Sequence, residues 1–384
     1  MSAAGTQSPF TAGLLTPAGR GAVATVRIRG GAIPPFHPVG GRDLSQYAIG
    51  RVLFGRWGDG AGDGAGEDVV VVRRDLETLD VHCHGGHAAV ARILNDLQTA
   101  GARIVCGWET AAESLGSFAA ECRNAVSLTR TTRTAGLVLE QSGGLLRRCF
   151  EELADLAESS PEITSARIDE LLRWADFGRH LTNPWRVVVA GRPNVGKSSL
   201  VNVLVGFPRA IVFDDAGTTR DVVTVETAFD GWPVELIDTA GLRNTDAALE
   251  AAGVERARGA MQAADCRVSV VDVSRPLQDA DRELLCEDDR PSVAVANKCD
   301  LPAVWDAAGL NVDVEPLAVS SLTGTSIDSL QAAIVERLVP EVPPPGTAIP
   351  LTDRQVSLLR EARKTFERGD AAAGRAVVLR VLEG

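Results

Sequence analysis

The chain has 384 residues, of which 45% are hydrophobic, a composition that predicts a globular protein of two to three domains with a large core. No apolar run approaches the roughly 18 residues of a membrane-spanning helix, and the N-terminus lacks the basic and apolar regions of a signal peptide, so we expect a cytoplasmic protein. The net charge of -12 is concentrated in residues 185–340, where 24 acidic residues outnumber 14 basic ones, which argues against a domain that grips nucleic acid nonspecifically.

The first 122 residues alternate between β-rich runs and one helical run. Residues 10–29 contain two β-rich segments around a Pro/Gly turn at 17–21, a pattern typical of a hairpin. Residues 88–100 have the apolar spacing of a helix. Alternating apolar and polar residues recur between them at 51–57, 69–73 and 78–82. These patterns predict a small α+β domain over residues 1–122.

The segment from His82 to His87 carries side chains of the types that bind zinc. Alternate residues of a strand point to opposite faces, so His82 and His84 would share a face that Cys83 does not, and the sequence has no second ligand cluster. The seven cysteines are scattered without paired spacing, which predicts reduced thiols. A strand that runs into the Gly85-Gly86 turn is therefore favoured over a metal site.

Residues 123–182 and 343–384 have the spacing of amphipathic helices. Gly143-Gly144 should break or kink the first of them, and the proline-rich start of the second part should form a stiff exit linker. The two parts flank residues 183–342, so we expect one helical domain with another domain inserted in it. Three independent domains are disfavoured, because a lone C-terminal helix could not bury its apolar face. The expected apolar stripe comprises Leu146, Phe150, Leu153 and Ala157.

A P-loop begins the inserted domain. Residues 186–190 form a short apolar run that predicts a buried strand, and the pattern Gly-x-x-x-x-Gly-Lys-Ser follows directly, before apolar residues resume at helical spacing. Backbone N–H groups of such a loop close around phosphate oxygens, Lys197 would reach the β- and γ-phosphates, and Ser198 would bind Mg²⁺. The expected nucleotide contacts in this loop are Asn194, Val195, Gly196, Lys197, Ser198 and Ser199.

Two further motifs follow in the order of a Ras-like α/β domain. About 20 residues after the P-loop, Thr219 stands where switch I places a threonine on Mg²⁺. Asp238 ends an apolar strand and would hold the water shell of the metal, and the Gly241 N–H would face the γ-phosphate. The expected nucleotide contacts in these motifs are Phe213, Asp214, Asp215, Ala216, Gly217, Thr218, Thr219, Asp238, Thr239, Ala240 and Gly241.

The guanine motif Asn297-Lys298-Cys299-Asp300 follows another apolar strand. Asp300 would accept hydrogen bonds from the base N1 and N2 hydrogens, whereas a carboxylate that faced adenine would find no donors, so GTP is favoured over ATP. The remaining base-pocket contacts are expected from Ser320, Ser321 and Leu322. Five motifs in the correct order and spacing predict a GTP-binding domain.

The sequence resembles the MnmE (TrmE) family of tRNA-modification GTPases. The resemblance is carried by the motifs at 191–200, 210–221, 238–243 and 253–256 and by first-domain segments at 16–28 and 81–86, so it spans most of the chain. It implies a GTPase that dimerises and acts with a flavoprotein partner in modification of the tRNA wobble uridine, with tRNA contacted indirectly. It also implies a potassium ion at Asn194, Phe213, Asp215 and Thr218, and catalytic roles for Lys197, Thr219, Gly241 and Asn244.

The chain departs from the family pattern in three places. Asn244 replaces the usual glutamate that orients the attacking water, which predicts slow hydrolysis, with Asp246 near enough in sequence to substitute. Residues 101–125 lack the Gly-Glu-Phe-Thr and Asn-Gly-Lys motifs. The chain ends at Leu382-Glu383-Gly384 where the family has a Cys-Ile-Gly-Lys tail.

The folate-binding positions of the family are only partly present. Arg27 matches and Asp80 stands where an acidic residue is expected, but two lysines are missing, so binding of a folate derivative is doubtful. The leading hypothesis is a potassium-dependent GTPase of tRNA modification, and the alternative is a divergent paralogue that binds GTP as a slow switch. A ribosome-assembly GTPase is disfavoured, because we find no appended basic RNA-binding domain in the sequence.

Overall fold

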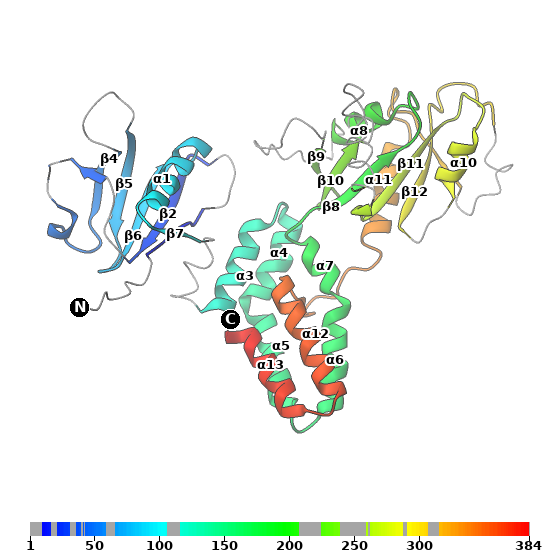
Figure 1. Cartoon of the computed structure of the whole chain (residues 1–384). Coiled ribbons are helices and arrows are strands. Elements are labelled where there is room, and N and C mark those ends of the chain that lie inside the picture. Colours follow the sequence, from blue (N-terminus) through cyan, green and yellow to red (C-terminus); the bar gives the residue numbers. More distant parts are fainter. Residues whose placement is uncertain are drawn as a thin grey trace, which may run out of the picture. The chain divides into compact units, whose positions relative to one another are not determined.

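The structure is a computed structural model of the chain (Figure 1). The chain divides into two compact units. Unit 1 comprises Met1–Leu128, Arg147–Ile168 and Ser357–Gly384, and unit 2 comprises Thr129–Leu146 and Asp169–Val356. The residues that the structure describes are 10–16, 21–30, 36–39, 41, 43–58, 66–105, 116–206, 224–238, 259, 262–286, 290–305 and 315–383.

Unit 1 contains a seven-stranded sheet in the order β3-β4-β5-β6-β2-β1-β7. Its neighbouring strands are antiparallel except for the parallel pair β1 and β7. Strand β4 buries Leu53, Gly55 and Trp57 and exposes Phe54 and Arg56, the alternation that a sheet with one covered face requires. The strands are β1 (Thr11–Leu14), β2 (Val23–Arg29), β3 (Phe36–Pro38), β4 (Val52–Trp57), β5 (Glu67–Arg73), β6 (Thr78–His84) and β7 (Arg103–Ile104).

Helix α1 (His87–Thr99) covers that face of the sheet through Ile93 and Leu97, which are fully buried in the core of the domain (Figure 1). The indole of Trp57 also donates a hydrogen bond to Asp96 on this helix at 3.0 Å. The predicted hairpin is confirmed by the antiparallel pairing of β1 with β2. A short 3-10 helix, η1, spans Leu44–Gln46.

The other helices of unit 1 pack against one another. Phe118 of α3 (Ser117–Leu128) meets Phe150 of α5 (Leu146–Leu156) edge to face, with ring centroids 6.0 Å apart. Arg375 of α13 (Ala371–Glu383) donates to the carbonyl of Ala154 at 3.1 Å. Parts of α6 (Pro161–Arg173) and α12 (Asp353–Glu367) also belong to this unit. The stripe predicted at 146, 150, 153 and 157 is fully buried, as expected.

The two glycines at 143–144 interrupt the helix that contains them. Helix α4 (Thr132–Glu140) passes into a π-helical turn, η2 (Gln141–Leu145), before α5 begins. Gly144 has φ 108°, a conformation that is easy only for glycine. The kink predicted from the sequence is therefore confirmed.

Unit 2 contains a six-stranded sheet in the order β13-β12-β11-β8-β10-β9. Only β9 runs antiparallel to its neighbour, and the other pairs are parallel. Three consecutive valines of β8, at 187–189, are fully buried, as expected of a central strand covered on both faces. The strands are β8 (Trp185–Ala190), β9 (Thr224–Phe229), β10 (Trp232–Asp238), β11 (Cys266–Asp272), β12 (Ser292–Asn297) and β13 (Leu317–Ala318).

Helices lie on both faces of this sheet (Figure 1). Helices α8 (Lys197–Gly206) and α11 (Ile327–Leu338) pack against Val268 and Val270 of β11. Helix α10 (Asp279–Leu285) packs on the opposite face against Val271. The carboxyl ends of β8, β10, β11 and β12 consequently meet at one edge, where α/β sheets bind ligands.

Helix α4 and helix α7 (Ala175–His180) also belong to unit 2 and contact its sheet. Arg133 of α4 donates to the carbonyl and the carboxylate of Asp230 at 2.7 and 2.6 Å and lies over the ring of Trp232. Phe177 of α7 packs edge to face against Trp185 and Trp232. In the described part of the chain, no helix has the length and hydropathy needed to span a membrane.

Candidate nucleotide site

The loop from Gly191 to Gly196 joins β8 to the first turn of α8. A Cβ atom at Gly191 would lie 2.4 Å from the carbonyl oxygen of Val270, and one at Gly196 would lie 2.3 Å from Nδ2 of Asn297. Gly196 also has φ 98°, which L side chains rarely adopt. Both positions therefore require glycine because neighbouring atoms approach closely, and the loop ends at the N-terminus of a helix, where the helix dipole favours an anion.

Lys197 and Ser198 begin α8 at this loop. The Lys197 side chain is buried, and its ammonium donates to the carbonyl of Arg192 at 2.9 Å, inside the loop. The Ser198 hydroxyl donates to Oδ2 of Asp238 at 2.6 Å. Asp238 ends β10, so the neighbouring parallel strands β8 and β10 bring together the two oxygens that the sequence assigns to Mg²⁺ and its water shell.

The guanine motif lies at the end of β12 and is built into the same edge. Asn297 is fully buried, and its Nδ2 donates to the carbonyl of Val195 at 2.9 Å while its Oδ1 accepts from the Ser321 amide at 3.1 Å. Asp300 is exposed, and one carboxylate oxygen accepts from the buried Ser320 hydroxyl at 2.5 Å. Asn297 thus ties the P-loop to the segment at 320–322, and Asp300 presents a carboxylate to solvent beside it.

Two acidic residues that the sequence analysis did not select support this edge. Asp281 of α10 accepts from the Arg192 guanidinium at 2.8 Å. Asp272 at the end of β11 accepts from the Lys298 ammonium at 2.6 Å. Burial alone would raise the pKa of Asp272, but hydrogen bonds from Lys298 and Ser274 hold it below its usual value. In the sequence, the only indication of these roles is that Asp272 ends an apolar strand and that Asp281 lies on the helix that follows this strand.

Several predicted site residues lie outside the described part of the chain. They comprise Phe213, Asp214, Asp215, Ala216, Gly217, Thr218, Thr219, Thr239, Ala240, Gly241, Asn244 and Asp246. Of the four residues implied for potassium, only Asn194 is described, with φ 65°. The contacts of switch I and of the water-orienting position therefore stay predictions.

Comparison with known proteins gives three kinds of match. A family model described as 50S ribosome-binding GTPase matches residues 186–298. The chain is 31% identical over 397 residues to the tRNA modification GTPase MnmE of Latilactobacillus sakei subsp. sakei strain 23K, a match that covers 92% of this chain and 86% of the relative. The chain belongs to the MnmE family. The MnmE of Geobacillus thermodenitrificans strain NG80-2 is 30% identical over 425 residues, covering 96% and 90% of the two chains.

Membership of the MnmE family confirms the resemblance found in the sequence and makes this chain a GTP hydrolase. Among solved structures, the G domain of the T. maritima FeoB iron transporter matches 40% of this chain and 99% of that chain at 26% identity, with a TM-score of 0.30.

The MnmE first domain of this chain pairs its two predicted folate residues with each other. Arg27 on β2 and Asp80 on β6 are register partners, and the guanidinium donates to both carboxylate oxygens at 2.7 and 2.9 Å. The hydrogen bond that Arg27 donates to Asp80 raises the pKa of Arg27, and the opposing effect of burial is smaller. The two charges largely neutralise each other, which leaves less charge for a ligand.

The histidines at 82 and 84 have protein partners in this MnmE chain. His82 Nδ1 lies 2.9 Å from the Thr25 hydroxyl, and His84 Nδ1 lies 2.5 Å from a carboxylate oxygen of Glu67. Among the described residues, no group of three or more histidine, cysteine, aspartate or glutamate side chains is arranged to hold a metal ion.

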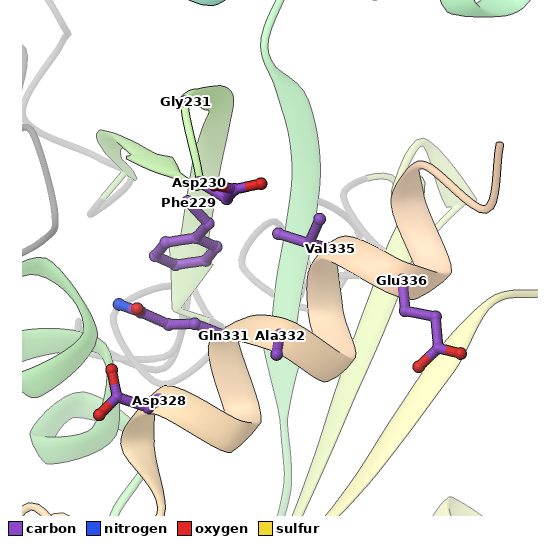
Figure 2. A pocket seen from close by; sticks show the side chains of 8 residues that line it. All are labelled: Phe229, Asp230, Gly231, Asp328, Gln331, Ala332, Val335 and Glu336. Atoms are coloured by element: carbon purple, nitrogen blue, oxygen red, sulfur yellow. The ribbon is translucent and has the colours of Figure 1, made fainter. Parts of the chain in front are cut away.

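A cavity of about 570 Å³ lies at the other end of the nucleotide domain from the P-loop edge (Figure 2). Figure 2 shows Phe229 and Asp230 on the β9–β10 turn and Gln331 and Val335 on α11 around it. None of the eight lining residues belongs to the predicted nucleotide site, so the site rests on the motifs at the carboxyl edge of the sheet.

Proposed function

We propose that this member of the MnmE family is a potassium-dependent GTPase that acts in modification of the tRNA wobble uridine. The observation that carries the nucleotide part is the convergence of Lys197, Ser198, Asp238 and Asn297 at one sheet edge, with Ser198 and Asp238 in direct hydrogen-bond contact. The observation that carries the modification part is similarity over 86% of the length of a relative named as a tRNA modification GTPase.

We infer the metal contacts from the donor types. Ser198 and Asp238 supply hard oxygen ligands, the kind that Mg²⁺ prefers, and their 2.6 Å contact brings both oxygens to one point beside the P-loop. Thr219 would join them. Potassium would be held by Asn194 with Phe213, Asp215 and Thr218, and it would supply positive charge at the phosphates during hydrolysis.

We infer the domain organisation from the order of the elements along the chain. Helices α3 to α7 precede β8 and helices α12 and α13 follow α11, which supports a nucleotide domain at 183–342 inserted between helical parts at 123–182 and 343–384, after an α+β domain at 1–122. Dimerisation, a flavoprotein partner and indirect contact with tRNA are proposed from the family.

Two observations favour the alternative, a divergent GTP switch without a modification role. Asn244 carries an amide where the family has a carboxylate, so it can orient a water but cannot take its proton. The Arg27–Asp80 pair engages the two remaining folate-binding positions with each other. Under this alternative single-turnover hydrolysis is slow in the native protein and faster in Asn244→Glu.

Genetic complementation tests the proposal directly. The chain is expressed in a bacterial strain that lacks its MnmE, and the tRNA wobble uridine is analysed by mass spectrometry, with Lys197→Ala as the control that removes the P-loop ammonium. The proposal predicts restored modification by the native chain and none by Lys197→Ala. Absent modification by a chain that still binds GTP would support the divergent switch.

A further inference from the structure

We propose that Asp272, which lies outside the recognised nucleotide motifs, is a positioning residue for guanine nucleotide binding, because it holds the Lys298 side chain against the P-loop. This inference rests on the proposed guanine site. Asp272 is the last residue of β11. It would contribute to nucleotide affinity through Lys298 and not by contact with the nucleotide.

The geometry around Lys298 forms a bridge between two strands and the P-loop. The ammonium donates to Oδ2 of Asp272 at 2.6 Å and to the carbonyl of Asn194 at 2.9 Å. Asp272 and Asn297 are register partners on β11 and β12, so Asp272 lies directly beside the residue that precedes Lys298. One carboxylate therefore fixes the side chain that spans from the guanine motif to the phosphate loop.

Asp272 itself is held by contacts that leave Oδ2 directed at Lys298. Its Oδ1 accepts from the amide and the hydroxyl of Ser274 at 2.9 and 2.6 Å, and its backbone carbonyl accepts from the Trp305 indole at 3.1 Å. The residue is 6% exposed. The Lys298 side chain is 26% exposed, so solvent screens this charge-assisted hydrogen bond less than it would screen one on the open surface.

The bridge bears on nucleotide binding because both of its ends have backbone conformations that need support. Lys298 has φ 67° and Asn194 has φ 65°. These backbone conformations are uncommon for residues other than glycine and need surrounding contacts to persist. Lys298 is a long, flexible side chain, and loss of the Asp272 contact frees its rotamers. Nucleotide binding would then have to order both segments, which lowers the affinity.

A double-mutant cycle on affinity for a fluorescent GDP analogue tests the inference. The variants are Asp272→Ala, Lys298→Ala and the double variant, with Asp272→Asn as the isosteric check and Asp279→Ala, an exposed carboxylate on α10, as the matched control. We expect Asp272→Ala and Asp272→Asn to weaken GDP about tenfold or more. The double variant should bind no more weakly than Lys298→Ala, because Asp272 acts through that lysine.

Two further readouts separate positioning from a purely structural role. Thermal unfolding without nucleotide should change little in Asp272→Asn, and the hydrolysis rate at saturating GTP should stay near that of the native protein, so the loss appears in KM. Additive losses in the cycle, or native GDP affinity in both Asp272 variants, would overturn the inference. Native affinity in Lys298→Ala would instead show that the guanine site itself is assigned wrongly.

Discussion

At the scale of single residues, we expect recognition of guanine to depend on one carboxylate. Asp300 is positioned by the buried Ser320 hydroxyl and presents its charge to solvent beside Asn297. We predict that Asp300→Asn weakens GTP and favours xanthine nucleotide, because the amide would offer a donor to the extra carbonyl of xanthine. Competition between GTP and xanthosine triphosphate measures the change. Unchanged GTP affinity would remove Asp300 from the site.

The cysteines differ in burial, and this difference leads to a second prediction for single residues. Burial raises the pKa of the Cys266 thiol to about 12. At about pH 8 roughly one molecule in ten thousand would carry the reactive thiolate at that position. Cys286 is exposed. Timed alkylation with mass spectrometry should therefore modify Cys286 well before Cys266, which should stay intact until the protein is denatured. Equal rates for these two cysteines would contradict the buried placement of β11.

Some residues of the candidate site can be predicted from the sequence and others cannot. Lys197, Ser198, Asp238 and Asn297 belong to fixed spacings, and the structure brings them to one edge as expected. Asp272 and Asp281 belong to no such pattern. An aspartate after an apolar strand has many uses, so only the contact with a partner far along the chain identifies its role.

At the scale of elements, α4 is fastened to the β9–β10 turn through its N-cap. The Thr131 hydroxyl accepts from the Thr134 amide at 3.2 Å and donates to the carbonyl of Gly231 at 2.6 Å. We predict that Thr131→Ala lowers the free energy of unfolding by about 1 to 2 kcal/mol, since both a helix cap and a contact across the unit are lost. Chemical denaturation measures it.

Thr132→Ala is the matched control for that change, because Thr132 is the exposed first residue of the same helix and serves as neither cap nor partner of Gly231. Its effect should stay within about 0.5 kcal/mol. Equal losses in the two variants would show that the cap contact is not the cause.

The same elements show why local pattern predicts strands better than it predicts contacts. The apolar strands expected at 186–190 and before the motifs at Asp238 and Asn297 are present as β8, β10 and β12, because continuous apolar runs identify buried parallel strands. The Gly143-Gly144 kink followed from glycine alone. The contact between Thr131 and Gly231 joins residues 100 positions apart and has no local signal.

At the scale of the whole molecule, the family resemblance predicted more than composition did. It covered the first domain, where short strands β3 and β7 carry too few residues to show a period. It also implied folate binding at Arg27 and Asp80, which the structure pairs with each other. A family pattern identifies positions, but the surrounding residues decide whether those positions retain charge for a ligand.

We therefore predict that the chain binds 5-formyltetrahydrofolate at best weakly. Two lysines that would pair with the ligand's carboxylates are missing, and each such contact contributes roughly 1.5 to 3 kcal/mol, so affinity should fall more than about a hundredfold. Titration calorimetry with parallel GDP binding as the control measures it. Micromolar folate affinity would contradict this prediction and would favour a complete modification enzyme.

The most direct test of the potassium-dependent GTPase is hydrolysis of GTP in potassium and sodium chloride at equal ionic strength. Each salt is assayed at saturating GTP with the native chain and with Asn194→Ala. Because a correctly placed cation stabilises charge that develops on the phosphates, the rate in potassium should exceed that in sodium by about tenfold or more. Asn194→Ala should lose the difference while it still binds GDP. Equal native rates in the two salts would contradict the account.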